Sequence, residues 1–223
     1  NGISKEFQND ASNRISVWSG VTTVEHKGLN PGRFIQMKNK DFEFITKKYS
    51  DKIENKSSLY RIWNGLATYG KESGSYRVEG VHPDYQFLEN ETLTAGRYLN
   101  QNDIDHNEKV VVLGHKVKRD LFKEEDAIGK QLQVSGVNFK VVGVYTDPGG
   151  EREEARIFLP ITTSQKVFNG GNIIRNMAFT LPPCSTMKSR ITSARRSSSP
   201  SLRTWRWRGS VCFGQRECTV SSK

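Results

Sequence analysis

KVVVLGHKVKRDLFKEEDAIGKQLQVSGVNFKVVGVY, residues 109–145, is the stretch from which the fold of this chain is best inferred. Residues 110–113 are β-branched or aliphatic without interruption, which is typical of a strand buried on both faces. Apolar side chains then recur at Val117, Leu121 and Phe122, about one face of a helix, with charged residues between them. The first half of the stretch therefore predicts a buried strand followed at once by an amphipathic helix.

The second half of the stretch predicts a β-hairpin. Its two arms, residues 131–134 and 139–145, alternate apolar and other residues, as strands with one buried face do. Ser135-Gly136 lies between the arms and has the composition of a tight turn. The strand, helix and hairpin are expected to form a β-rich unit that contains no reactive group.

On either side of this unit, predicted strands alternate with short helices. Alternating apolar residues predict the strands, which are residues 13–24, 59–69, 75–81, 156–160 and 173–181. Apolar spacings of three or four predict helical segments at residues 39–54, 84–88 and 162–168, with Asn39 as the N-cap of the first. A polar, glycine-rich segment at residues 147–154 is expected to be a mobile hairpin tip and the element best suited to contact a partner.

The composition indicates a globular chain. Its 223 residues are 35% hydrophobic and 26% charged, and this length suits one or two compact domains. No apolar run approaches the roughly 18 residues that would span a bilayer. We therefore expect a soluble chain or a soluble piece of a larger protein, and the start at Asn1 without methionine favours the second.

The net charge of +10 is concentrated at one end. Of 34 basic and 24 acidic residues, nine and one lie in residues 184–223, which leaves 25 and 23 in the remainder. Because the body is nearly neutral, no nucleic-acid partner is expected.

The basic tail, residues 182–223, differs in composition from the body. Its Ser and Arg content is high, it lacks a periodic apolar pattern, and it contains the cysteines Cys184, Cys212 and Cys218. Their spacing matches no common zinc or disulfide arrangement. Two interpretations remain open, a translated shift of reading frame and a natural basic tail.

Motifs for catalysis or cofactor binding are missing from the sequence. There is no glycine-rich phosphate loop and no nucleophile elbow, and the glutamates of residues 151–154 are expected to be solvated. The cluster Asp103-Ile104-Asp105-His106 resembles a calcium loop in composition but lacks its glycine and terminal glutamate, so an Asx-rich turn and helix cap is favoured. The four histidines, expected at the surface or in turns, are His26, His82, His106 and His115. No catalytic, cofactor-binding or metal-binding residue and no cofactor is therefore expected.

Four aromatic residues near the predicted hairpin could serve recognition. They are Tyr76, Tyr85, Phe87 and Tyr98. Either a second core or a partner surface would explain them, and the core is the favoured interpretation.

Several short motifs follow one another in an order that resembles a known family. They are Gly96-Arg97 with Asn100 and Asp103, residues 110–114, Leu121-Phe122, Ile128-Gly129, Phe139, residues 141–144 and Leu159-Pro160. Their succession resembles the periplasmic core domain of permease subunits in MacB-type ABC transporters, a family with LolC, LolE and FtsX relatives. The resemblance covers residues 1–181.

The resemblance implies an α+β fold with two subdomains. Residues 1–82 would form the first half of a porter-like βαβ subdomain, and residues 83–181 would form a mainly β inserted subdomain. After that point the family chain returns to the porter-like part, which residues 182–223 do not resemble. If they are out of frame, the porter-like part would expose apolar surface.

The resemblance also implies a function. The chain would be a noncatalytic domain of an inner-membrane ABC permease, facing the periplasm, that transmits ATP-driven conformational change. Its expected partners are a periplasmic or outer-membrane protein, a cytoplasmic ATPase subunit or domain, and a second permease subunit in a homodimer or heterodimer. The alternative is a stand-alone extracytoplasmic binding module.

Overall fold

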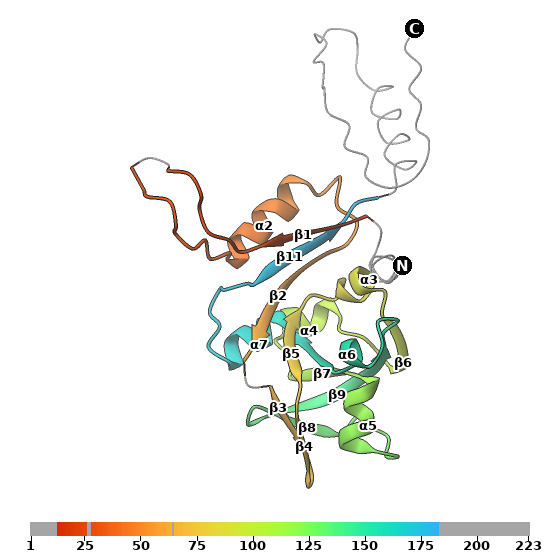
Figure 1. The fold of residues 1–223 in the computed structure, drawn as a ribbon. Coiled ribbons are helices and arrows are strands. Elements are labelled where there is room, and N and C mark those ends of the chain that lie inside the picture. Colours follow the sequence, from red (N-terminus) through yellow and green to blue (C-terminus); the bar gives the residue numbers. More distant parts are fainter. Residues whose placement is uncertain (1–12, 26–27, 64, 183–223) are drawn as a thin grey trace, which may run out of the picture. The chain divides into compact units, whose positions relative to one another are not determined.

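The computed structural model describes residues 13–25, 28–63 and 65–182. They lie within one folding unit, residues 1–183, and Figure 1 shows their arrangement. The predictions made for the basic tail, its cysteines included, and for His26 concern residues outside the described ranges.

The described residues form a mixed sheet with helices packed on it, which confirms the predicted α+β class. The strands are β1 (Arg14–Trp18), β2 (Lys56–Ile62), β3 (Leu66–Tyr69), β4 (Glu72–Ser75), β5 (Arg77–Val81), β6 (Thr92–Gly96), β7 (Val110–Gly114), β8 (Gln131–Val134), β9 (Val137–Thr146), β10 (Arg156–Pro160) and β11 (Asn176–Thr180). The helices are α2 (Asn39–Lys48), α3 (Tyr85–Glu89), α4 (Gln101–Asp105), α5 (His115–Phe122), α6 (Glu151–Glu154) and α7 (Ile161–Val167). The strand order is β1-β11-β2-β5-β10-β7-β9-β8-β3-β4, and β6 pairs with β9.

The central stretch has the predicted strand, helix and hairpin. Every residue of β7 is buried, and α5 follows it directly. Strands β8 and β9 form the hairpin around Ser135 and Gly136, whose φ angles of 47° and 87° are both positive. Two positive φ angles are what a type I′ hairpin turn requires.

The largest buried cluster lies between α5 and this part of the sheet. Val117, Leu121 and Phe122 project from α5 into it, and Leu132 and Phe139 meet them from the hairpin. Burying large apolar side chains of this kind stabilises a fold by roughly 1.5–3 kcal/mol each. This region therefore supplies the stable centre of the described chain.

A second part of the sheet consists of β1, β11 and β2, with α2 beside it (Figure 1). Here β11 lies between β1 and β2 and is antiparallel to both. Phe42 of α2 packs with Met177 and Phe179 of β11 in a separate buried cluster. Strands β1 and β11, from the two ends of the described chain, thus lie side by side in one layer.

Strand β2 belongs to both parts of the sheet. Its first half, residues 56–59, pairs with β11, and its second half, Tyr60 to Ile62, pairs with β5. The division into subdomains at residue 82 stays a prediction, and strand pairing crosses that position. Toward one edge of the sheet, β3 pairs with both β4 and β8. Toward the other edge, β11 pairs with both β1 and β2.

Several predicted boundaries are wrong. Strand β1 ends at Trp18, and the single strand predicted at residues 59–69 consists of β2 and β3. Helix α2 ends at Lys48, and its N-cap is Lys38, whose backbone N–H donates to the Asp41 carboxylate at 2.8 Å. Asn39 is instead the first helical residue.

The side chain of Asn39 is engaged elsewhere. Its amide makes reciprocal hydrogen bonds with the Gln165 amide of α7, both at 2.9 Å. This tertiary pairing competes with the capping geometry that its sequence position suggests. Asn39 therefore connects α2 to α7 and does not cap its own helix.

The segment at residues 147–154 is not a hairpin tip. It contains α6, and the strands on either side, β9 and β10, are separated in the sheet by β7. Arg119 of α5 pairs with Glu151 at 2.6 Å, and the Tyr145 hydroxyl donates to the Glu153 carbonyl at 3.0 Å. These contacts fasten the segment to the buried centre.

Candidate functional site

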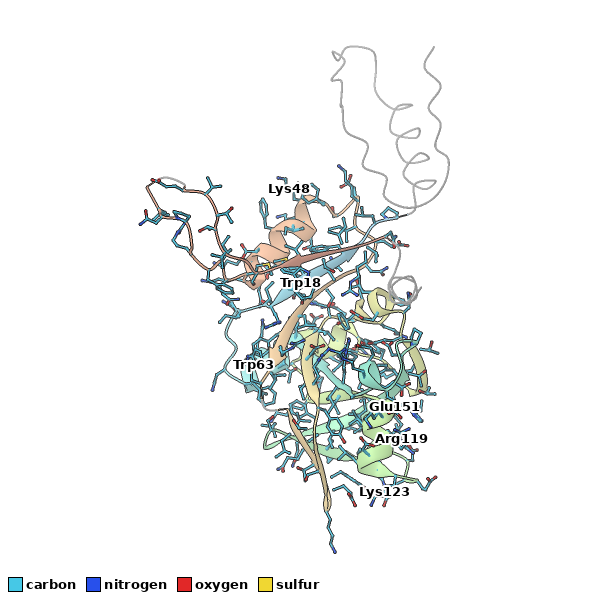
Figure 2. All side chains as sticks on the ribbon, viewed as in Figure 1. Trp18, Lys48, Trp63, Arg119, Lys123 and Glu151 are labelled. Carbon is cyan, nitrogen blue, oxygen red and sulfur yellow. The ribbon has the colours of Figure 1, made fainter. Side chains whose placement is uncertain are left out.

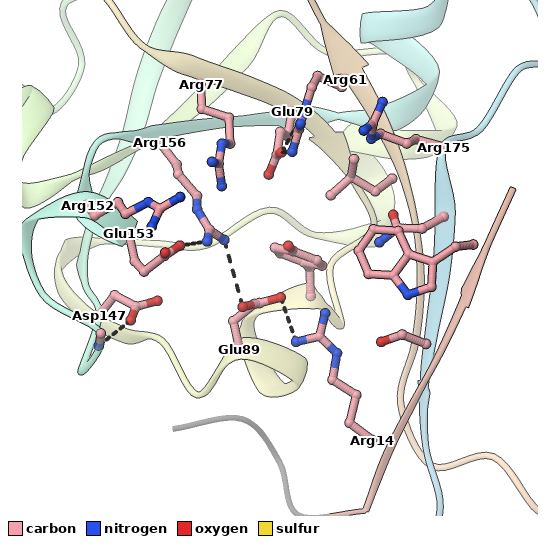
Figure 3. A pocket seen from close by; sticks show the side chains of 16 residues that line it. Arg14, Arg61, Arg77, Glu79, Glu89, Asp147, Arg152, Glu153, Arg156 and Arg175 are labelled. Carbon is pink, nitrogen blue, oxygen red and sulfur yellow. Dashed lines mark hydrogen bonds and ion pairs between the residues drawn. The ribbon is translucent and has the colours of Figure 1, made fainter. Parts of the chain in front are cut away.

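A polar cleft of about 480 Å³ lies where the two parts of the sheet meet (Figure 3). Its lining comes from β1, β2, β5, β10 and β11, from α3, and from the segment around α6. The charged residues that line it are Arg14, Arg61, Arg77, Glu79, Glu89, Asp147, Arg152, Glu153, Arg156 and Arg175. Six arginines thus face four carboxylates, an excess of two positive charges.

Strand geometry places these side chains on one face. Successive residues of a strand point to opposite sides of a sheet, so alternate positions share a face. In β5 the alternate positions are Arg77 and Glu79, and in β2 they are Leu59 and Arg61. The register pairs Arg61 with Glu79 directly across the two strands. The cleft is therefore built from the alternation of strands that pair with one another.

Half of the arginines are engaged by carboxylates. The Glu89 carboxylate of α3 forms ion pairs with Arg14 at 2.8 Å and with Arg156 at 3.8 Å. Arg156 also pairs with Glu153. Because Arg14 lies on β1 and Glu89 on α3, this network connects the outer strand of the sheet to the wall of the cleft (Figure 3).

The pair of Arg61 and Glu79 lies deeper. Nη2 and Nε of Arg61 both reach Oε1 of Glu79, at 2.8 and 3.2 Å. Glu79 is only 1% exposed, so its charge depends on this partner. Its other carboxylate oxygen, Oε2, is buried and has no hydrogen-bond partner among the described residues.

The other three arginines, Arg77, Arg152 and Arg175, lie within 4 Å of no carboxylate oxygen in the described part of the chain. The pKa of Arg77 is lowered because its guanidinium is partly buried and because Arg156 lies nearby, with smaller contributions from Arg61 and Arg152 and an opposing one from Glu79. Arg175 lies over the Trp63 ring, with its guanidinium carbon 5.7 Å from the ring centroid. The cleft therefore keeps cations that its own carboxylates do not neutralise.

This cleft was not predicted from the sequence. Its arginines and glutamates come from four strands, from two short helices and, for Arg175, from the residue before β11, and no short motif unites them. The available signal was charge at alternate positions of an otherwise apolar strand, as in Arg77-Val78-Glu79. Such a pattern is unusual in a strand whose neighbours are buried, because an unpaired buried charge is costly.

The four aromatic residues belong mainly to the core. Tyr85 and Tyr98 are buried and pack around Phe158, and Tyr76 is partly buried against the main cluster. Phe87 is 57% exposed. The favoured interpretation thus holds for three of the four, and Tyr85 also lines the cleft.

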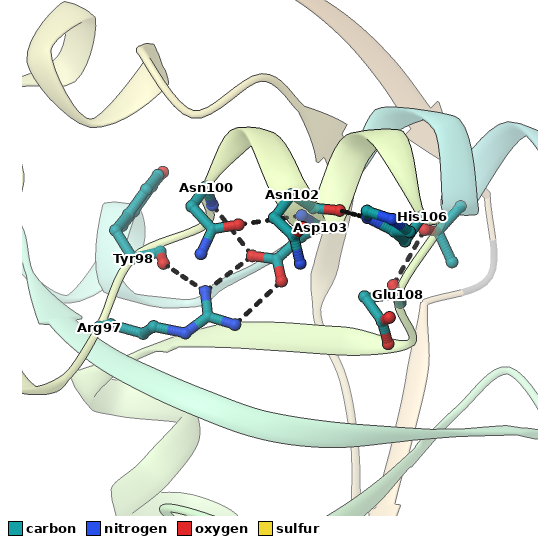
Figure 4. A network of polar contacts seen from close by, with 8 residues as sticks. Arg97, Tyr98, Asn100, Asn102, Asp103, His106 and Glu108 are labelled. Carbon is teal, nitrogen blue, oxygen red and sulfur yellow. Dashed lines mark hydrogen bonds and ion pairs between the residues drawn. The ribbon is translucent and has the colours of Figure 1, made fainter.

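The acidic cluster near residue 103 is a helix cap (Figure 4). The Asn100 side chain accepts from the Asp103 N–H, and the Asp103 carboxylate accepts from the Asn100 N–H, both at 2.9 Å. Arg97 binds the same carboxylate with two nitrogens, at 2.7 and 2.9 Å. Burial raises the pKa of Asp103, but the hydrogen bonds from Arg97 and Asn100 outweigh it and hold the pKa below its usual value.

His82 is neither a simple surface residue nor part of a cluster with metal-ligand geometry. Its ring packs on Phe42 with 4.7 Å between centroids, and its Nδ1 accepts from the Ser58 N–H at 3.2 Å. Burial lowers its pKa to about 4, so the ring is neutral at pH 7. In the described ranges, no three His, Cys, Asp or Glu side chains are grouped so that they could hold a metal ion.

Exposed apolar side chains are numerous on the part of the sheet formed by β1, β11 and β2. Trp18 is 62% exposed and Trp63 is 71% exposed, and Figure 2 shows where both lie. With Phe34 and Ile173 they line a second, more apolar pocket. Exposed apolar side chains are therefore present on this part of the sheet, whereas the porter-like subdomain itself stays a prediction.

Comparison with known proteins places these features in context. A family model described as the MacB-like periplasmic core domain matches residues 1–191. A macrolide export ATP-binding/permease protein MacB from Bdellovibrio bacteriovorus is 28% identical over 176 residues, which are 77% of this chain and 27% of that protein. The protein of the same name from Chlorobaculum tepidum is 31% identical over 165 residues, 73% of this chain and 25% of the relative. The chain thus spans about a quarter of the length of these curated relatives.

Two solved structures share the fold. The periplasmic region of MacB from Actinobacillus actinomycetemcomitans superimposes with a TM-score of 0.67 at 22% identity, covering 88% of this chain and 89% of that one. The extracellular domain of the noncanonic ABC-type transporter YknZ from Gram-positive bacteria gives a TM-score of 0.58 at 16% identity, covering 74% and 86%. In the part of the chain that the structure describes, no helix is both long and apolar enough to cross a membrane.

Proposed function

Because this chain belongs to the MacB-like periplasmic core domain family, we propose that it is the noncatalytic extracytoplasmic domain of an ABC transporter permease and transmits ATP-driven conformational change. The energy would come from a cytoplasmic ATPase subunit or domain of the full-length protein. The recipient would be a periplasmic substrate or a periplasmic or outer-membrane partner protein. The names of the relatives suggest macrolides as the first substrates to test.

The observation that supports this proposal is the continuity of β2 across the two parts of the sheet. Its residues 56–59 bind β11 and its residues 60–62 bind β5, so one strand belongs to both parts. Backbone hydrogen bonds on both sides of one strand resist separation of its neighbours. A displacement of β1 and β11 would therefore be transmitted to β5 and β10 through the backbone of β2 and its hydrogen bonds to both neighbours.

The ion pair between Arg14 and Glu89 is a second connection. It bridges β1 and α3 at 2.8 Å, and both side chains are nearly buried. A buried, charge-assisted contact of this kind is strong and directional. We propose that it keeps β1 in register with the cleft wall while the domain moves.

The test is made in the full-length permease assembled with its ATPase and a second permease subunit. Arg14→Gln removes the bridge between β1 and α3, and Arg14→Lys keeps a positive charge that can reach Glu89. We expect macrolide export to fall in R14Q while ATP hydrolysis continues, and to recover partly in R14K. Export and ATP hydrolysis are measured on the same membranes.

A matched control is Arg33→Gln, because Arg33 is exposed and is not among the residues that line the cleft. Export by R33Q should equal that of the unmodified protein. Equal export by R14Q and R33Q would contradict the proposed role of the bridge. Loss of ATP hydrolysis in R14Q together with export would point to a failure of assembly.

A stand-alone extracytoplasmic binding module remains the second candidate. The cleft favours it, because a concave site with unneutralised arginines suits a ligand without any ATPase. The two candidates differ in the gene: an apolar segment of about 20 residues encoded just before Asn1 supports the permease, and a cleaved signal peptide there supports the module.

A further inference from the structure

The cleft contains arginines without a carboxylate partner and buried acceptor atoms without a hydrogen-bond partner among the described residues. We propose that it is a binding site for a small ligand that carries an oxyanion, a carboxylate or a phosphate, beside a hydrogen-bond donor. The oxyanion would bind Arg77 and Arg152, while Arg175, at the opposite end of the cleft (Figure 3), would add to its positive charge, and the donor would reach Glu79 or Asn176. This goes beyond transmission of conformational change and does not depend on it.

The first argument is the excess of guanidinium groups. Arg14, Arg61 and Arg156 have carboxylate partners at the cleft, whereas Arg77, Arg152 and Arg175 have none within 4 Å among the described residues. Guanidinium groups bind carboxylate and phosphate through pairs of parallel hydrogen bonds. Several cations around one concavity also raise the local concentration of anions.

The second argument is the pair of buried acceptors. Oε2 of Glu79 and Oδ1 of Asn176 both line the cleft, are buried, and have no hydrogen-bond partner among the described residues. The two residues are 1% and 6% exposed, so bulk water reaches them poorly. A buried acceptor without a partner has lost its hydrogen bonds to water and gained none in the protein. A ligand with an amine or hydroxyl group would supply the missing hydrogen bond.

Asp147 also lines the cleft but does not neutralise these arginines through an ion pair. Its Oδ1 accepts from the Gly149 N–H at 2.6 Å, and no ion pair connects it to an arginine in the described chain. Burial raises its pKa, so its negative charge is already disfavoured. In the described chain the Asp147 carboxylate is thus bound by its own loop and forms no ion pair with Arg77 or Arg152.

Size limits the ligand. A volume of about 480 Å³ falls within the range of small-molecule sites, roughly 300–1,000 Å³. The lining is polar and strongly charged, which disfavours a large apolar compound. We therefore assign the cleft to a small polar anion.

The test uses the 223-residue chain and isothermal titration calorimetry. Sodium phosphate carries an oxyanion with hydroxyl donors, sodium acetate carries a carboxylate alone, and sodium chloride at equal ionic strength is the reference. We expect phosphate or acetate to bind measurably above chloride, and the relative affinities identify which oxyanion the site prefers. Binding should weaken as sodium chloride is added, because the attraction is screened.

Variants locate the binding. Arg152 and Arg175 are exposed, so R152Q and R175Q are expected to fold even if R77Q does not, and circular dichroism checks each. Loss of the Arg152 guanidinium should weaken binding about tenfold, as a lost charge-assisted contact does, and loss of Arg175 should weaken it less. R33Q, which removes an exposed arginine outside the cleft, should bind as the unmodified chain does.

Two results would overturn the assignment. One is that phosphate and acetate give no more heat than chloride. The other is that R152Q and R175Q bind as tightly as R33Q. Neither result bears on the permease proposal, because that proposal is tested by export and ATP hydrolysis in the assembled transporter.

Discussion

The centre of the sheet and the cleft differ in what their residues do for the protein. Around β7, α5 and the β8–β9 hairpin, the inward-facing side chains are apolar and fully buried, with Phe139 and Leu132 at 0% exposure. At the cleft, by contrast, neighbouring strands of the same sheet project arginines and glutamates. One continuous sheet thus carries an apolar core in one region and a charged cleft in another, according to the side chains it places at alternate positions.

Removing a large side chain from the centre should have the largest effect on stability. Phe139→Ala deletes a completely buried ring that packs near Phe168, and it should lower the free energy of unfolding by about 3–5 kcal/mol. Phe87→Ala is the matched control, because its ring is mostly exposed, and it should cost about 0.5 kcal/mol or less. Urea denaturation of the chain measures both. Similar costs for the two variants would contradict the comparison.

The buried ion pair of the cleft should give the next largest effect. Arg61→Met leaves Glu79 buried without its partner and should destabilise the chain by about 2 kcal/mol, below the usual cost of breaking a fully buried pair because Arg61 is partly exposed. Replacing both residues, as in R61M/E79L, should recover most of this loss. The same denaturation experiment tests it, and a double variant no better than R61M would contradict the explanation.

His82 should add a pH dependence of about the same size. Its pKa is about 4 in the folded chain against an ordinary value of 6.5, so between these two values the unfolded chain binds a proton that the folded chain does not. The free energy of unfolding should therefore fall by about 2.5 kcal/mol as the pH drops from 6.5 to 4, and become constant with respect to this group about one pH unit above 6.5.

His82→Asn isolates that contribution. Asparagine can accept from the Ser58 N–H as Nδ1 does, but it does not titrate. The difference in unfolding free energy between the two proteins, measured from pH 4 to 8, should become flat about one pH unit above 6.5 and slope below that. A flat difference throughout would show that the histidine ring is not held neutral.

The smallest effect is expected on the exposed apolar face. Trp18→Ala removes a ring that is 62% exposed, so the chain should lose about 0.5 kcal/mol or less. Thermal denaturation of the variant, compared with F139A, measures this. A loss as large as that of F139A would mean that Trp18 belongs to a core.

Local patterns in the sequence were sufficient for the centre of the fold. The strand β7, the helix α5 and the hairpin around Ser135-Gly136 pack against one another within a short segment, so periodicity and turn residues determine them. The pairing of β11 with β1 could not be predicted from such local patterns. Arg14 and Thr180 come from opposite ends of the described chain, and nothing near either residue indicates its partner.

The cleft was unpredictable for the same reason, with one exception. Its residues converge only through long-range strand pairing, such as that of Arg61 with Glu79. The charged alternation in Arg77-Val78-Glu79 was visible in the sequence, but its meaning depends on which strands lie beside it. The helix cap at Asp103 was correctly favoured because a cap is a local structure.

The antiparallel pairing of β1 with β11 has a mechanical consequence. Arg14 lies opposite Thr180 and Trp18 lies opposite Asn176, so residue 13 and residue 181 leave the sheet at the same end. Pulling these two points apart would break the backbone hydrogen bonds one after another, beginning with the bond that the Leu181 N–H donates to the Asn13 carbonyl at 3.3 Å. Moving them in the same direction would strain none of those pairs. The pairing of β1 with β11 therefore tolerates a displacement shared by residues 13 and 181 and is broken most easily by one that separates them.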